Sequence, residues 1–225
     1  MEYTTIADSL GSWDVHVSPD PAQIGPTDIP VHVRETSDRL FFVYTGQAKS
    51  LLMNPQTFCQ KAGLFDHNLV VFEDPFVAYY AKGVSDSVNT FEALLDWERG
   101  LRQRLSHVRR TFCLGTSMGA FAAILHGHAL CAEVVWAFAP KTIVDNAPSA
   151  VESAQPTDLK AVLDNSNGVT RYELYYNDGF VADRESALRL GQCDGVVLKP
   201  QNARNPNVVK TLDTLGLMAG VCAVV

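Results

Sequence analysis

The sequence predicts a single α/β domain, spanning residues 1–225, around a mostly parallel sheet of about seven or eight strands with helices on both faces. Short apolar runs rich in β-branched and aromatic residues alternate with longer segments of helical periodicity along the chain. A hydrophobic fraction of 47% and a charged fraction of 19% are typical of globular proteins. The length suits one sizeable core, and no change in composition marks a second domain.

The predicted strands follow one another at the spacing of a parallel sheet whose strands are joined by helices. They are residues 29–34, 40–45, 68–72, 111–114, 133–138, 172–176 and 195–199. The first alternates apolar and polar residues, whereas the second is continuously apolar, as in strands buried on both faces. Because Ser37-Asp38 is a turn signal between these two strands, we expect them to form a hairpin.

The segments between the strands have helical periodicity, so we expect them to form helices. The expected helices are residues 55–62, 88–105, 117–130, 158–163, 183–190 and 207–218. Ser85 or Ser87 is the expected N-cap of the second helix, because either hydroxyl precedes its first apolar residue. The apolar tail over residues 215–225 is too short to span a bilayer, so we expect it to pack on the domain.

The N-terminal extension, residues 1–28, has no pattern that places it, and it lacks the basic start and apolar stretch of a secretion signal. Five cysteines form no C-x-x-C pair, which indicates reduced thiols and a cytoplasmic location. The net charge of −7 is spread along the chain. Neither nucleic acid nor a membrane is therefore an expected partner.

The stretch GTSMG, residues 115–119, has the spacing of a serine nucleophile between a strand and a helix. Such a nucleophile elbow needs small residues two positions before and after the serine, and Gly115 and Gly119 stand there. The turn would hold Ser117 in a strained conformation at the N-terminus of a helix. The alternative is an ordinary turn in which Ser117 caps the helix.

An oxyanion hole needs two backbone N–H donors beside the serine. Met118 would supply one at the N-terminus of the helix, where the helix dipole also favours negative charge. The second donor is expected in the loop after an earlier strand, Gly46-Gln47-Ala48, with Gln47 as the best candidate.

These segments resemble the α/β-hydrolase superfamily between residues 29 and 218. The resemblance rests on GTSMGAFAAILHG, on the strand order and on NDGFVADRESALRL after a Tyr-rich strand. The chain is similar to small bacterial hydrolase-like proteins in which the strand after the elbow ends in Phe-x-Pro, here Phe138-Ala139-Pro140. The resemblance implies a three-layer α/β-hydrolase-type fold, and serine chemistry if the catalytic triad is complete.

In this superfamily an acid and then a histidine follow the serine along the chain. Asp178 stands where the acid is expected, directly after the strand over residues 172–176, although an Asp-Gly turn would also explain it. Asp183 is a second candidate, and a helix N-cap explains that residue more simply.

The expected histidine is missing. The loop over residues 201–209 contains none, and Pro206 stands where similar proteins have a histidine directly before Asn-Val-Val. His126 lies nine residues beyond Ser117 on the same helix, about 13 Å along its axis, and His128 is farther. His67 and His107 precede their strands and His32 lies inside one, so only His16 is topologically free to act as a base.

Two functions remain open, and the sequence does not decide whether the chain is an enzyme. One is a serine ester or thioester hydrolase or acyltransferase with an incomplete triad, its base supplied by His16, a substrate amine or a partner protein. The alternative is a catalytically inactive pseudo-hydrolase that binds a ligand or a protein. Accordingly, the partners considered are a small acyl or ester ligand and a protein.

No cofactor and no metal is expected. The sequence contains no metal-ligand motif and no P-loop, and His126 and His128, two residues apart on a helix, face different directions. The aromatic residues Phe76, Tyr79 and Tyr80 follow a strand end on the side of Ser117 and indicate an apolar lid or pocket wall, with simple packing or a partner surface as the alternatives.

Overall fold

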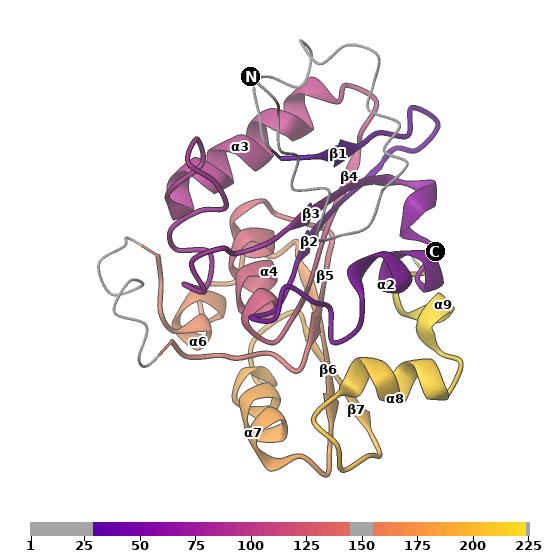
Figure 1. Cartoon of the computed structure of the whole chain (residues 1–225). Coiled ribbons are helices and arrows are strands. Elements are labelled where there is room, and N and C mark those ends of the chain that lie inside the picture. Colours follow the sequence, from indigo (N-terminus) through magenta and orange to yellow (C-terminus); the bar gives the residue numbers. More distant parts are fainter. Residues whose placement is uncertain (1–28, 145–154, 224–225) are drawn as a thin grey trace.

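The computed structural model describes residues 29–144 and 155–223, in which a twisted seven-stranded sheet lies between two layers of helices (Figure 1). The strands are β1 Val31–His32, β2 Arg39–Tyr44, β3 Asn68–Phe72, β4 Arg110–Thr116, β5 Val134–Phe138, β6 Arg171–Asn177 and β7 Val196–Gln201. Their order is β1-β3-β2-β4-β5-β6-β7. Only β1 is antiparallel to its neighbour among these strands, so the predicted fold class is confirmed.

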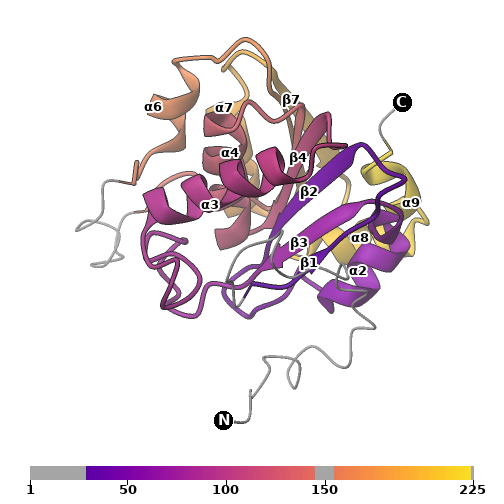
Figure 2. The same ribbon diagram turned by 90° about the horizontal axis from the view of Figure 1, so that it is seen from above.

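The helices divide between the two faces of the sheet, as Figure 2 shows from above. One face carries α3 Phe91–Arg104, α4 Met118–Ala129, α6 Leu159–Leu163 and α7 Val181–Leu190, and the other carries α2 Pro55–Lys61, η2 Leu64–Asp66, α8 Val208–Thr214 and α9 Met218–Val221. Successive side chains of β2 alternate between the two cores, because neighbouring residues of a strand point to opposite faces.

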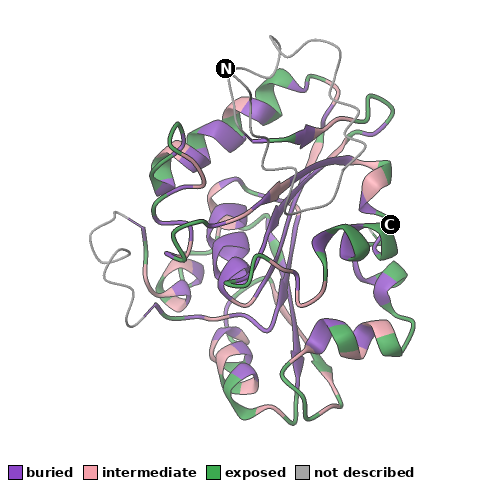
Figure 3. Ribbon diagram, viewed as in Figure 1, coloured by how far each residue is buried: buried purple, intermediate pink, exposed green. Residues whose placement is uncertain are grey.

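Burial is deepest in the middle of the sheet (Figure 3). Every residue of β5 is buried, whereas the residues of β7, at the edge, are half-buried or exposed. The continuously apolar strands of the sequence are thus the ones covered on both faces, as parallel sheets require.

The predicted hairpin between the first two strands is wrong. β1 pairs with β3, with Val31 opposite Val70, while β2 lies between β3 and β4 and is parallel to both. The Asn68 side chain explains this arrangement, because its amide donates to the carbonyls of Ser37 and Arg39 and its oxygen accepts from the Arg34 N–H. The turn after β1 is therefore tied to the beginning of β3.

Two helix boundaries also differ from the prediction. α3 begins at Phe91, where the Thr90 hydroxyl accepts from the Ala93 N–H at 3.0 Å, and neither Ser85 nor Ser87 caps it. The segment before it turns instead, because the Val84 N–H donates to the Val88 carbonyl. The last predicted helix is divided into α8 and α9 around Gly216, whose φ of 69° suits a glycine.

The topology places two loops side by side. From β2 the chain crosses to β3 on one side, and from β4 it continues to β5 on the other, so the order of the strands reverses between β2 and β4. Ligands of parallel sheets bind at the carboxyl ends of the strands at such a reversal. Ser117 directly follows β4, and Gln47 lies in the loop after β2.

Candidate active site

The turn at Ser117 is strained. Ser117 has φ 52° and ψ −113°, a conformation that residues other than glycine seldom adopt. Its N–H donates to the Phe138 carbonyl of β5 at 2.8 Å, and its carbonyl accepts from the Ala120 N–H at 3.1 Å. Its hydroxyl makes no capping hydrogen bond to α4, so ordinary N-capping does not explain the serine.

Two glycines make this turn sterically feasible. A Cβ atom on Gly115 would lie 2.1 Å from the Gly119 carbonyl oxygen, and a Cβ on Gly119 would lie 2.1 Å from the Tyr44 carbonyl oxygen. Both distances are far inside van der Waals contact, so a larger residue at either position would push α4 away from β2 and β4.

The loop after β2 approaches the same turn. The Gly46 N–H donates to the Ser50 carbonyl at 2.8 Å, and the Thr116 hydroxyl donates to that carbonyl at 3.1 Å. This ties the loop, with the exposed Gln47 in it, to the residue before Ser117. Met118 begins α4, where the first N–H groups of a helix have no partner within the helix.

The two candidate acids have different surroundings. Asp178 is exposed, and its backbone N–H donates to the Gln201 carbonyl. Asp183 is buried in the first turn of α7 and is not its N-cap, because the helix begins at Val181 after Phe180. Burial raises the pKa of the Asp183 carboxyl, an effect that the nearby Lys141 opposes.

Lys141 connects Asp183 to the turn. Its ammonium lies 3.8 Å from a carboxylate oxygen of Asp183, and its backbone N–H points to the Ser117 carbonyl at 3.4 Å. Lys141 is not among the residues predicted from the sequence, although its place directly after Phe138-Ala139-Pro140 was a usable signal.

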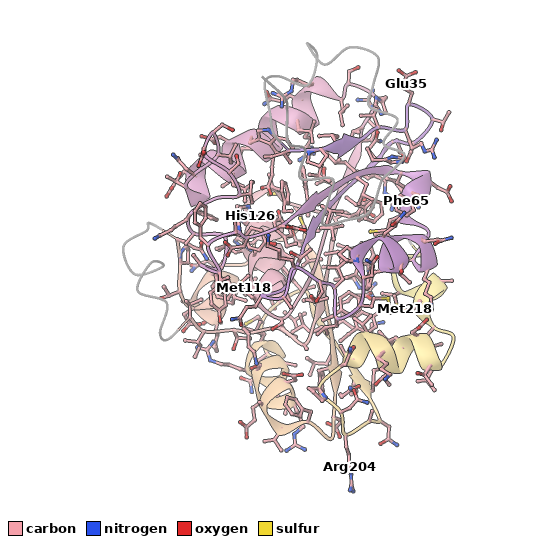
Figure 4. All side chains as sticks on the ribbon, viewed as in Figure 1. Glu35, Phe65, Met118, His126, Arg204 and Met218 are labelled. Carbon is pink, nitrogen blue, oxygen red and sulfur yellow. The ribbon has the colours of Figure 1, made fainter. Side chains whose placement is uncertain are left out.

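Asparagines fasten the loop in which a histidine was expected. Asn177, at the end of β6, donates from its amide to the Asn205 carbonyl at 2.7 Å. Asn207 donates to the Leu52 carbonyl at 2.7 Å and caps α8 by accepting from the Lys210 N–H. Pro206 is exposed between them. Arg204, in the same loop, points away from the sheet (Figure 4).

Each of the five histidines in the described segments has a partner away from Ser117. The pairs are His32 Nε2 with the Phe65 carbonyl, His67 Nδ1 with Ser37 Oγ, His107 Nε2 with Asn68 Oδ1, His126 Nδ1 with Glu98 Oε2 and His128 Nδ1 with Tyr172 Oη. None of these partners belongs to the loops around Ser117. The remaining candidate base, His16, lies outside the described residues.

In the aromatic segment after β3, Tyr80 fits the alternative of simple packing. Tyr80 is fully buried, and its hydroxyl lies 3.0 Å from the carbonyl oxygens of both Thr45 and Phe72, so it belongs to the core rather than to a pocket wall. Tyr79 is half-buried against the Phe121 ring of α4, and Phe76 is exposed.

Other features of the described segments lie away from this turn. A surface groove of about 520 Å³ is lined by residues at the beginnings of β6 and β7. These amino ends of the strands lie on the opposite side of the sheet from the carboxyl end of β4, which Ser117 follows. In residues 29–144 and 155–223, no three His, Cys, Asp or Glu side chains gather as metal ligands. No helix of these segments is long and apolar enough to cross a membrane.

No protein-family profile matches this sequence, and no curated protein does. Solved structures do resemble the fold. MenH from S. aureus superposes with a TM-score of 0.59 at 7% identity, covering 86% of this chain and 96% of that one. A lipase-esterase related protein from Clostridium acetobutylicum superposes with a TM-score of 0.55 at 12% identity, covering 86% and 98%.

A third similar structure is the capsule O-acetyltransferase of Neisseria meningitidis serogroup A. It has a TM-score of 0.51 at 10% identity and covers 79% of this chain and 87% of that one. At such identities the likeness concerns the path of the backbone, because the same fold supports different chemistries.

Proposed function

This chain has the α/β-hydrolase fold, and on that premise we propose that it performs acyl transfer at Ser117. The reaction is hydrolysis of a small ester or thioester, or transfer of its acyl group to another acceptor. The Ser117 hydroxyl oxygen attacks the acyl carbon and gives its proton to the base, and the backbone N–H groups of Met118 and Gln47 stabilise the oxyanion that forms. The bond from the acyl carbon to the alcohol or thiol of the substrate then breaks, and this group leaves with the proton. Water, or another acceptor in the transfer reaction, attacks the acylated Ser117 and releases the acyl group, which restores the hydroxyl.

One observation carries the proposal: Ser117 keeps a strained backbone although its hydroxyl does not cap the helix. Such strain costs about 1–3 kcal/mol and persists mainly where function uses it. Glycines at 115 and 119, where no Cβ fits, maintain the same geometry. A turn that served only to connect β4 to α4 would have no need of this arrangement.

The acid of the site is one of two aspartates. Asp178 has the expected position in the chain, whereas Asp183 is buried beside Lys141, which contacts the Ser117 carbonyl. The base is His16, a substrate amine or a group from a partner protein. A serine without a base is a poor nucleophile. A well-studied protease that lacks a triad member retains a rate only about 10³–10⁴ times that of the uncatalysed reaction.

A second candidate function is binding of an acyl ligand or a protein without catalysis. It is favoured by the loop after β7, where Asn177, Asn205 and Asn207 make the contacts that hold the loop and Pro206 takes the place of the expected histidine. A cytoplasmic location accompanies either function and is supported by cysteines that are all free, four of them buried.

A fluorophosphonate probe tests the proposal, because it reacts with an activated serine hydroxyl. We expect the full-length protein to be labelled, and Ser117→Ala to abolish the labelling. Ser50→Ala, in the neighbouring loop, is the matched control and should be labelled like the wild type. His16→Ala shows whether that imidazole is the base.

Labelling that survives Ser117→Ala would reject the assignment of the nucleophile. If the wild-type protein is not labelled but binds acyl compounds, the second candidate function holds.

A further inference from the structure

A single carboxylate organises the loop after β3. Asp74 is buried, and its two oxygens accept from the backbone N–H groups of Phe76 at 2.9 Å, Ala78 at 2.7 Å and Tyr80 at 2.9 Å. Three charge-assisted hydrogen bonds to one side chain give residues 74–80 a defined shape.

This loop is strained at three positions. Val77, Tyr79 and Tyr80 have φ values of 52°, 57° and 65°. A β-branched residue such as Val77 is especially rare in this region, which glycine occupies readily. A glycine would adopt this conformation with less strain, so Val77 stands at a position that its backbone does not favour.

The loop packs against α4, which begins directly after Ser117. The Tyr79 ring packs edge-on against the Phe121 ring, 5.5 Å away, in the second turn of α4. The Tyr80 hydroxyl contacts the Thr45 carbonyl at 3.0 Å, and that carbonyl is one of the groups that a Cβ on Gly119 would meet. Through these two tyrosines the loop contacts both the beginning of α4 and the end of β2.

The tip of the loop is apolar and open to solvent. Phe76 is 46% exposed and Val77 43%, although both follow a strand at the same edge of the sheet as Ser117. A single exposed apolar residue is common, whereas here two adjacent ones lie on one strained loop at the carboxyl ends of the strands. They offer a preformed surface for an apolar ligand.

We propose that Phe76 and Val77 are the surface on which the hydrocarbon chain of the acyl substrate lies, so that the enzyme prefers medium-length chains to short ones. This inference rests on the proposed function and assigns its substrate class. The acyl carbon is at Ser117, and the chain extends over the loop tip instead of into solvent.

Binding measured in the Ser117→Ala background tests the proposal without requiring turnover. The probes are the butanoyl, hexanoyl and octanoyl thioesters of N-acetylcysteamine, titrated by calorimetry. We expect affinity to rise by up to about fourfold for each methylene that is buried. Val77→Gly and Phe76→Ala should each weaken octanoyl binding by about tenfold and leave butanoyl binding within about twofold.

Stability separates this effect from damage to the fold. Val77→Gly should raise the unfolding temperature, because glycine accepts the positive φ without strain. Weaker octanoyl binding in a more stable protein cannot result from unfolding. The matched control is Val169→Gly, which removes an exposed valine next to the opposite edge of the sheet and should leave all three affinities unchanged.

The proposal is overturned if the octanoyl thioester binds no more tightly than the butanoyl thioester, or if both loop variants keep the chain-length preference. If the protein is not labelled by fluorophosphonate but still binds longer acyl chains more tightly, only the proposed chemistry at Ser117 is rejected. If Ser117 is labelled but affinity does not depend on chain length, only the role of Phe76 and Val77 is rejected.

Discussion

Asp183 is a buried carboxylate that forms an ion pair with Lys141. Its side chain is 4% exposed, and the Lys141 ammonium lies 3.8 Å from its nearer oxygen. Burial raises the pKa of the carboxyl more than the attraction of the Lys141 ammonium lowers it, so the pKa lies above its usual value. Buried groups with perturbed pKa values are more common in functional sites than elsewhere.

This raised pKa predicts how stability depends on pH. Between the unfolded pKa and the raised folded pKa, the folded state binds the proton more tightly, so stability falls as pH rises through that window. Asp183→Asn removes the free-energy cost of keeping an ionised carboxyl buried. We expect the variant to unfold a few degrees higher than the wild type at pH 7, with the difference shrinking toward pH 3.5.

Thermal unfolding by circular dichroism at several pH values measures this difference. The matched control is Asp178→Asn, which alters an exposed aspartate five residues earlier and should change stability by less than about 0.5 kcal/mol. An Asp183→Asn protein that is less stable than the wild type at pH 7 would show that Lys141 stabilises the carboxylate more than burial destabilises it.

At the scale of elements, a buried polar network joins β2, α3 and α4. Glu98 of α3 accepts from the Tyr44 hydroxyl of β2 at 2.5 Å and lies 2.8 Å from Nδ1 of His126 in α4. Burial, and then the charge of Glu98, raises the pKa of Tyr44 well above its usual value, so the phenol keeps the proton that it donates. The network fixes α4, which begins at Met118, against β2.

Removing one member of this network should be costly. We expect Glu98→Ala to lower the free energy of unfolding by about 3–5 kcal/mol, because it leaves buried polar partners unsatisfied. Replacing Glu98 by Met and His126 by Leu together should cost less than the sum of the Glu98→Met and His126→Leu changes made singly, because neither partner of the pair is then left alone. Urea unfolding of the single and double variants measures this coupling.

Glu92→Ala, an exposed change in the first turn of the same helix, serves as the control and should have an effect below about 1 kcal/mol. Additive losses from the single and double variants would mean that Glu98 and His126 do not act as a unit.

At the scale of the whole molecule, contacts connect the turn at Ser117 with segments that follow four other strands. The loop after β2 is tied to Thr116, Lys141 after β5 contacts Ser117, and Asp183 after β6 contacts Lys141. The loop after β7 joins them through Asn207, which donates to the Leu52 carbonyl. Pro206, where the histidine was expected, directly precedes Asn207 in that loop.

This convergence predicts a gain of function. If the site lacks only a base, Pro206→His should raise the rate of fluorophosphonate labelling and of short-ester hydrolysis by about 10²-fold or more, as general-base catalysis does. Ser117→Ala in the same background should remove the gain. The control is Arg204→His, because Arg204 points away from the sheet and its replacement should change neither rate (Figure 4).

Rates of Pro206→His that match the wild type, in a variant that folds normally, would count against a site that is complete apart from its base. They would favour the function of binding without catalysis.

Much of this architecture could be predicted from local sequence. Apolar periodicity located β2 to β7 and most of the helices, and the spacing of Gly115, Ser117 and Gly119 identified the turn between β4 and α4. These features depend on residues that lie within a few positions of each other along the chain. The boundaries that were wrong, at Thr90 and Gly216, lie where a cap or a positive φ ends the periodic pattern.

The sequence by itself determined the fold class and the strained serine turn, because periodicity and glycine spacing act through neighbours in the chain. Only the tertiary structure decided that β1 pairs with β3, that Asp183 rather than Asp178 is buried next to Lys141, and that Val77 is held in a strained loop. Strand pairing, burial and enforced strain depend on contacts between residues far apart in sequence, and such contacts exist only when the chain is folded.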